Sequence, residues 1–97
     1  MNYRNRRLLD LAHRVDECQH CGKYTPGCEP AHANWQEYGK GGALKAHDFY
    51  HAALCHECHA ALDQGNTMDK AEKKDMWLRA HLKTIALYWK NEWVRVA

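Results

Sequence analysis

The chain has 97 residues, a net charge of +2 and an isoelectric point near 8.3. This length supports one small domain, residues 1–97, and a domain of this size often needs a metal ion or disulfides to stabilise its fold. The charge permits a nucleic-acid partner without requiring one, while the lack of a long apolar run or a signal-peptide core predicts a cytoplasmic, reducing location and no membrane partner.

Residues 4 to about 15 predict a short amphipathic helix. Its apolar stripe begins at Leu8 and ends at Val15, as expected for a helix with one face on a core. Arg4, Arg7 and Arg14 lie away from this stripe. They form either a solvated face, which is the interpretation we favour, or an arm that grips phosphates.

A two-stranded hairpin is predicted in the middle of the chain. Residues 31–35 favour a strand with His32 and Asn34 on one face, and residues 49–54 favour the returning strand. The segment between them is rich in glycine and lysine. Such a long loop is often functional.

Two helices are predicted after the hairpin. The first is short, and it places His59 and Asp63 four residues apart on one face. The second covers about residues 68–93 and begins with a pattern that resembles a capping box. Its apolar residues recur at helical spacing and are expected to lie in the core: Ala71, Leu78, Leu82, Ile85, Trp89 and Trp93. For the tryptophans, a dimer surface is the alternative.

Two C-x2-C pairs are the strongest signal in the sequence. Cys18 and Cys21 form the first pair, and Cys55 and Cys58 form the second after a gap of 33 residues. In a reducing compartment such pairs indicate metal binding or redox chemistry, and we expect a closed four-cysteine zinc site that stabilises the fold. Separate redox pairs are the less favoured alternative, because the βαβ pattern of a thioredoxin-like domain is absent.

Cys28 is left over from the two pairs. It either replaces one zinc ligand or, as we expect, is a lone buried thiol. Cys28 and His32 also fit part of the RING pattern. That pattern requires two further C-x2-C pairs, and only one follows, so a cross-brace module with two zinc ions is a poor fit.

We call the tight turn formed by each C-x2-C pair a knuckle. A knuckle, a hairpin and a helix that starts at a second knuckle are the elements of a treble-clef zinc finger, so the predicted fold class is a small zinc-stabilised α+β domain. The two cysteine pairs, the Ala31-His32 dipeptide and His59 resemble the zinc-stabilised HNH (ββα-metal, or His-Me finger) endonucleases. Residues 17–63 are more closely similar to small phage and prophage nucleases of the YbcO type, with a core motif at 17–65. The shared features include the basic leading helix, the glycine-rich loop and an aspartate seven residues before the second knuckle.

The resemblance implies a metal-dependent endonuclease that hydrolyses phosphodiester bonds in DNA. Histidine suits the general base that deprotonates water, and His32 is the candidate. His59 and Asp63 offer one nitrogen and one oxygen ligand to a catalytic divalent ion, either Mg²⁺, Mn²⁺ or Zn²⁺. Asp48 either hydrogen-bonds His32 or contributes to the metal shell.

Two positions depart from the family pattern. Ala31 stands where many HNH enzymes carry an acidic or histidine metal ligand, and Tyr50 stands where a central asparagine is expected. Asp48 or His51 substitutes for that asparagine, and Asp48 is preferred for its spacing.

The alternative function is a non-catalytic zinc-stabilised module of phage origin that binds nucleic acid or a protein. In that case His32 is a packed histidine, and His59 and Asp63 are a surface pair. In either case we expect phosphate contacts from basic residues of the leading helix and the loop: Arg4, Arg6, Arg7, Lys40 and Lys45. Five histidines are expected to be exposed: His13, His20, His47, His56 and His81. His47 and His51 flank the predicted pocket.

Overall fold

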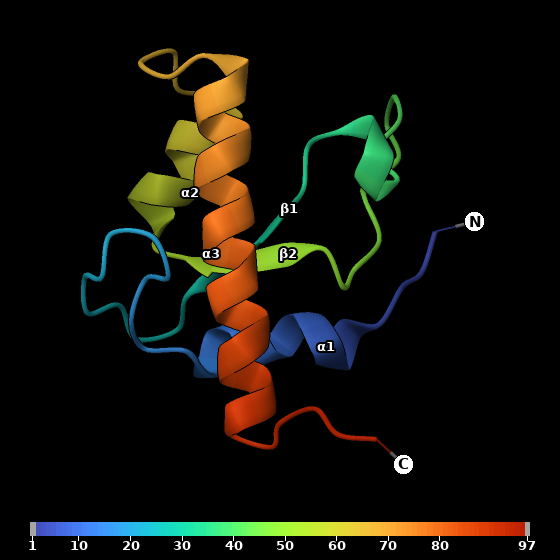
Figure 1. Cartoon of the computed structure of the whole chain (residues 1–97), viewed down its shortest axis with the longest axis vertical. Helices are drawn as coiled ribbons and strands as arrows, with labels where there is room; N and C mark the ends of the chain where they lie inside the picture. Colours follow the sequence, from blue (N-terminus) through green and yellow to red (C-terminus); the bar gives the residue numbers. More distant parts are fainter. Residues whose placement is uncertain (1, 97) are drawn as a thin grey trace.

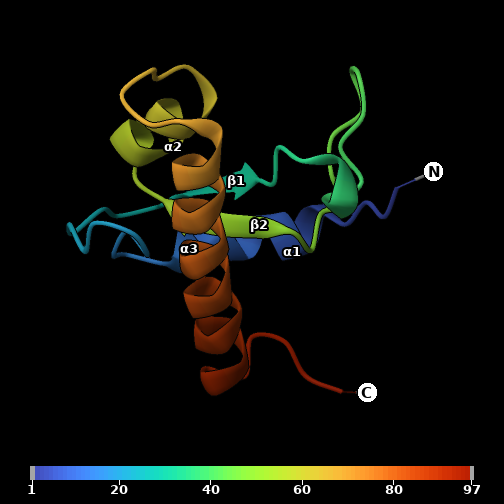
Figure 2. The same cartoon turned by 45° about the horizontal axis from the view of Figure 1, so that its top comes forward.

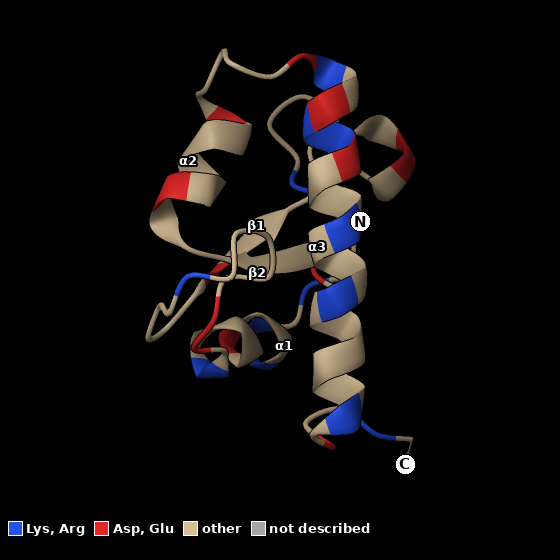
Figure 3. Cartoon of the chain, turned by 60° about the vertical axis from the view of Figure 1, so that its left-hand side comes forward, with Lys and Arg blue, Asp and Glu red and all other residues tan. Residues whose placement is uncertain are grey.

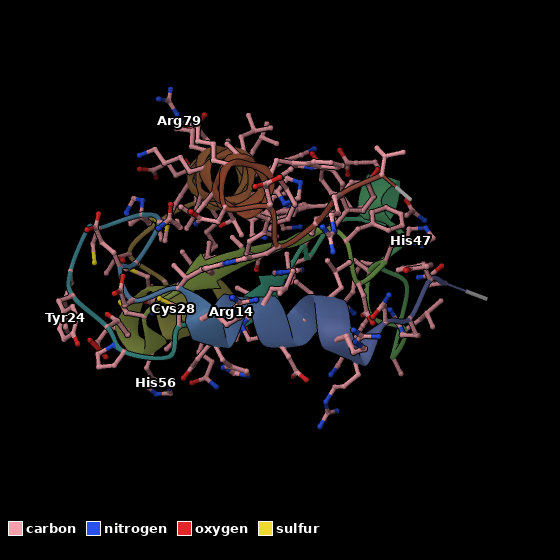
Figure 4. The ribbon with its side chains drawn as sticks, turned by 90° about the horizontal axis from the view of Figure 1, so that it is seen from below. Arg14, Tyr24, Cys28, His47, His56 and Arg79 are labelled. Carbon is pink, nitrogen blue, oxygen red and sulfur yellow. The ribbon has the colours of Figure 1, made fainter. Side chains whose placement is uncertain are left out.

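An antiparallel hairpin lies at the centre of the fold, between one long helix and the N-terminal helical segment (Figures 1 and 4). The computed structural model describes residues 2–96. The elements in chain order are α1 (Arg6–Asp10), a 3-10 turn (Leu11–Arg14), β1 (Glu29–His32), a second 3-10 turn (Gln36–Tyr38), β2 (His51–Leu54), α2 (His56–Asp63) and α3 (Lys70–Lys90). The predicted α+β fold class is confirmed, because a knuckle, a hairpin and a helix that opens at the second knuckle follow one another as expected.

The hairpin is short and covered on both faces. β1 and β2 pair from Glu29 with Leu54 to His32 with His51. All residues of β2 are buried, and its two alanines let neighbouring segments approach the backbone closely. Ala52 packs in the cluster that contains Trp77, whereas Ala53 packs in the cluster of Ala12, Val15, Cys28 and Tyr88.

α3 crosses the free edge of β2 and supplies hydrogen bonds to it. Thr84 Oγ1 accepts the Ala53 N–H at 3.0 Å and donates to a carbonyl of its own helix, and His81 Nδ1 donates to the His51 carbonyl at 2.7 Å. The Ala53 carbonyl accepts the Gln19 N–H at 3.1 Å. Buried backbone groups of this edge are therefore paired without a third strand.

The predicted core stripe of α3 is wrong for most of its residues, although Ile85 and Trp93 pack against the buried cluster that contains Tyr88. Leu78, Leu82 and Trp89 are exposed, and Leu82 retains 60% of its accessible surface. The buried face is displaced around the helix and includes polar side chains: Met76, Trp77, Ala80, His81, Thr84 and Tyr88. Burial of His81 also corrects the expectation that it is exposed. The buried face includes polar residues because it must bond to a strand edge, which a search for apolar periodicity does not detect.

The N-terminal segment forms a shorter helix than predicted. α1 is capped by Asn5, whose side chain accepts the Leu8 N–H, and the chain continues as a 3-10 turn. Arg4 precedes the helix, and its guanidinium donates to Asp48 Oδ1 at 3.2 Å and to the Ala46 carbonyl at 2.6 Å. Arg4 is exposed, as the solvated-face interpretation expects, but it also bonds to the chain between the strands.

Replacing Thr84 with valine tests the bond between α3 and the strand edge. Thr84→Val keeps the shape of the side chain but leaves the buried Ala53 N–H without an acceptor. We expect the free energy of unfolding to fall by about 1–3 kcal/mol in urea titrations. Thr84→Ser keeps the hydroxyl and is the matched control, with a smaller loss. Equal losses in the two variants would show that the hydroxyl is unimportant.

Candidate functional site

The four cysteines of the two knuckles come together, as predicted. One possible ligand atom from each of Cys18, Cys21, Cys55 and Cys58 lies within 4.8 Å of all the others. The Sγ atoms of Cys21 and Cys55 are 3.9 Å apart. A tetrahedral zinc ion with Zn–S bonds of about 2.3 Å separates its sulfurs by about 3.8 Å. The cluster is therefore consistent with a structural zinc ion.

Local backbone structure positions both knuckles. Gly22 has a φ of +78°, a value that favours glycine, and its N–H donates to the Cys18 carbonyl at 2.9 Å. Cys55 is the N-cap residue of α2, so Cys58 lies one turn into the helix. The bond from the Gln19 N–H to Ala53 fixes the first knuckle beside the strand that leads to the second.

The sulfur atoms shift one another's pKa values. Burial raises the pKa of the Cys18 thiol, but backbone N–H groups of Cys55 and Cys21 directed at its sulfur contribute to lowering the pKa to about 7. Burial and the neighbouring sulfurs raise the pKa of Cys58. Four thiols at this separation do not all lose their protons unless a cation lies among them, and a divalent ion supplies that charge.

Cys28 is a lone buried thiol, as expected. Its Sγ lies 3.7 Å from the Thr25 carbonyl, and burial raises its pKa to about 11. Figure 4 shows Cys28 and His47 at opposite ends of the molecule. Within residues 2–96, the knuckle cysteines are the only group of three or more His, Cys, Asp or Glu side chains close enough to hold a metal. A second zinc site of the cross-brace type is therefore not formed in this part of the chain.

His59 and Asp63 lie side by side on α2, as their spacing predicts. His59 Nε2 is 3.2 Å from Asp63 Oδ2, and His59 Nδ1 is 2.8 Å from Glu29 Oε1. The second oxygen of Glu29 contacts His56 Nδ1 at 3.0 Å. Burial raises the pKa of Glu29, but the two histidine contacts outweigh this effect and lower it. An ionised Glu29 therefore fixes the orientation of the His59 ring.

Sequence reasoning missed Glu29. Its position opposite Leu54 places it next to the start of α2, so the strand register was the missing information. The predicted first strand began at residue 31, two residues after the observed start of β1.

His32 ends β1 and hydrogen-bonds to Asp48. The distance from His32 Nε2 to Asp48 Oδ1 is 2.9 Å, and the Asn5 backbone N–H donates to Asp48 Oδ2 at 2.6 Å. Burial raises the pKa of Asp48, but the bonds from His32 and Asn5 and the charge of Arg4 hold it below its usual range. Asp48 lies in a turn before β2 and not in the strand, and of its two predicted roles the structure places it in contact with His32.

His32, His59 and Asp63 line one open cleft of about 310 Å³. Asn34 and the loop lysines Lys40 and Lys45 also border this cleft. The glycine-rich loop that carries the lysines extends from the hairpin near the N terminus (Figure 2). The arrangement therefore brings the oriented imidazole of His32, the neighbouring His59 and Asp63 side chains and two cations to one concave surface.

Several candidate positions lie outside the cleft lining. Ala31 is buried, and Tyr50 packs against Tyr38 with ring centroids 4.9 Å apart. His51 is fully buried, with Nδ1 2.6 Å from the Asp48 carbonyl and Nε2 2.8 Å from the Tyr88 hydroxyl. Burial lowers the pKa of His51 to about 4. His51 therefore belongs to the core, and Asp48 alone of the two proposed substitutes contacts His32 through its side chain.

Comparison of the chain with protein-family models, with curated proteins and with solved structures gave no match. No helix within residues 2–96 is long and apolar enough to cross a membrane.

Replacing single cysteines tests the metal centre. Cys55→Ser removes one sulfur of the cluster, so the purified protein should lose most of its bound zinc and its thermal stability should fall. Cys28→Ser is the matched control and should keep about one zinc ion per chain, since Cys28 lies outside the cluster. Zinc content is measured by mass spectrometry of the purified proteins. Equal zinc in both variants would contradict the four-sulfur site.

Proposed function

We propose that the protein is a metal-dependent endonuclease of the HNH type that hydrolyses phosphodiester bonds in DNA. The observation that carries the proposal is the common cleft, where His32 faces the same space as His59 and Asp63 and two lysines border the opening. Phosphodiester hydrolysis requires a base for water, stabilisation of phosphate charge and a binding surface for the backbone. The residues of this cleft are suited to each of these tasks.

His32 acts as the general base in this proposal. Asp48 is ionised and accepts a hydrogen bond from His32 Nε2, so Nδ1 of the neutral ring keeps its lone pair. That lone pair is available to a water molecule at the phosphate. Arg4 and the Asn5 N–H hold Asp48 in place, which fixes the tautomer and the direction of the ring.

His59 and Asp63 are the proposed ligands of a divalent ion. Glu29 occupies His59 Nδ1, so Nε2 is left to bind the ion beside the Asp63 carboxylate. One nitrogen and one carboxylate ligand suit Mn²⁺ or Zn²⁺, and the carboxylate alone suits Mg²⁺. The remaining coordination positions are left for phosphate oxygens and water. Such an ion supplies charge stabilisation at the phosphate and at the leaving oxygen.

Lys40 and Lys45 are the proposed phosphate contacts next to the reacting bond. They are carried by a loop in which Gly39 and Gly42 have positive φ values of +96° and +52°. Contacts of this kind give binding that weakens with salt and reads little sequence.

The contact between His59 and Asp63 also supports a second candidate function. When its ring is protonated, His59 pairs with both Glu29 and Asp63 without a metal ion. A zinc-stabilised module that binds nucleic acid or a protein without cutting would need only the cysteine cluster and the basic residues.

Nicking of supercoiled plasmid in the presence of Mg²⁺, Mn²⁺ or Zn²⁺ separates the two functions. The wild-type protein should nick, and His32→Ala should nick roughly 10²- to 10⁴-fold more slowly. His13→Ala, an exposed histidine in the 3-10 turn after α1, is the matched control and should retain activity. Equal cutting by His32→Ala would exclude His32 as the base. No cutting by wild type with any of the ions would favour the binding module.

A further inference from the structure

A second groove lies between the N-terminal segment and the chain that follows α3. Its volume is about 510 Å³, larger than that of the candidate cleft. Its lining includes Tyr3, Trp93 and three arginines, which are Arg7, Arg14 and Arg95. No acidic residue among residues 2–96 lines it. Figure 3 shows basic residues on α1 and on the segment after α3.

These arginines form no ion pair within residues 2–96. The arginine ion pairs of this part of the chain are instead formed by Arg4, Arg6 and Arg79. Several cations that share one groove without a carboxylate repel one another and attract an anion. The charge of the groove therefore complements a polyanion.

The groove is built by a defined turn at the end of α3. Glu92 adopts a φ of +56°, its N–H donates to the Trp89 carbonyl at 3.1 Å, and the Trp93 N–H donates to the Tyr88 carbonyl at 3.0 Å. This pair of bonds is a Schellman motif, and it turns the chain so that the Trp93 ring packs near the ring of Tyr88. The direction of the following segment is therefore fixed.

Trp93 in turn holds Arg14. The Arg14 guanidinium carbon lies 4.2 Å from the centroid of the Trp93 ring, a cation–π contact. Figure 4 shows Arg14 beside α1, whereas Arg79 points away from it on the far side of α3. An arginine positioned in this way loses less conformational freedom when it binds a phosphate.

A third cavity lies between the groove and the candidate cleft. It is bordered by Arg4, by Arg6 and by Asp48, which pairs with Arg4, and it shares His32 and Lys45 with the cleft and Asn5 with the groove. Basic side chains thus recur from Lys40 in the cleft, past α1, to Arg95.

We infer that this groove binds the phosphodiester backbone of nucleic acid that flanks the segment held in the cleft. Guanidinium groups match phosphate oxygens in shape and charge, and the spread of basic residues along a path fits a strand better than a single anion. The inference extends the proposed function, on which the position of the flanking segment rests. Binding is measured without cleavage, so the two can fail separately.

The test compares two triple variants of equal charge. The groove variant is Arg7→Gln, Arg14→Gln and Arg95→Gln, and the control is Lys70→Gln, Arg79→Gln and Lys83→Gln on the exposed surface of α3. Both carry His32→Ala, and no Mg²⁺ or Mn²⁺ is added. The probe is a fluorescein-labelled DNA duplex of about 25 base pairs followed by fluorescence anisotropy. Zinc content and thermal melting confirm folding.

We expect the groove variant to bind at least about tenfold more weakly at about 0.1 M salt. The slope of log affinity against log salt should fall by about 0.9 for each lost phosphate contact, or by 2–3 in all. The control should bind within about threefold of the parent. Equal weakening of both variants would overturn the groove assignment, because charge alone would then explain binding.

Two further measurements complete the test. If the groove variant melts early, Arg7→Gln with Arg95→Gln leaves the Arg14–Trp93 contact intact and should still reduce the salt slope by about 2. Polyglutamate is the competing probe. If it binds the parent as tightly as the duplex and the groove variant loses both, the groove is a site for acidic protein and the nucleic-acid assignment is overturned. If the parent binds DNA through the groove but the protein with His32 intact never nicks plasmid, only the nuclease proposal is refuted.

Discussion

The cluster of Cys18, Cys21, Cys55 and Cys58 is the constraint on which the rest of the structure depends. It closes a loop of 33 residues that contains both strands and the glycine-rich segment. It also fixes the point at which α2 begins, because Cys55 is the N-cap residue of that helix. The orientation of α2 then decides where His59 and Asp63 point. A small domain with a short hairpin has little other means to hold these elements together.

The second constraint is the polar contact between α3 and the free edge of β2. A two-stranded sheet leaves backbone groups exposed on both edges. Thr84 and His81 bond to the free edge of β2, and Trp77 Nε1 adds a bond to the carbonyl of Ala31 on β1, at 2.9 Å. Removing Thr84 or His81 leaves a buried backbone group of β2 unpaired. The long helix is therefore attached to the hairpin by direction-specific bonds as well as by apolar packing.

Features of the fold and the cleft that depend on local sequence patterns could be predicted, whereas features that depend on strand pairing or tertiary hydrogen bonds could not. Cysteine spacing and the α2 spacing of His59 and Asp63 are local patterns, and both led to correct geometry. The face of α3 was predicted wrongly, because Thr84 and His81 are buried for their hydrogen bonds and not for their hydropathy. Glu29 was missed because its contact with His59 depends on strand register, which is set by pairing over a distance in the chain.

The candidate cleft depends on both constraints. The sulfur cluster places His59 and Asp63 of α2, and the hairpin places His32 against Asp48, so the two sets of groups face one space. The proposed nuclease and the alternative binding module would share this scaffold and differ in whether the cleft performs chemistry. Both require that the knuckles are closed by a metal.

X-ray absorption at the zinc K edge of the purified protein tests that requirement most directly. Four sulfur atoms at about 2.3 Å around one zinc are the predicted first coordination shell. Protein without zinc, or a shell in which nitrogen or oxygen replaces sulfur, would contradict the account.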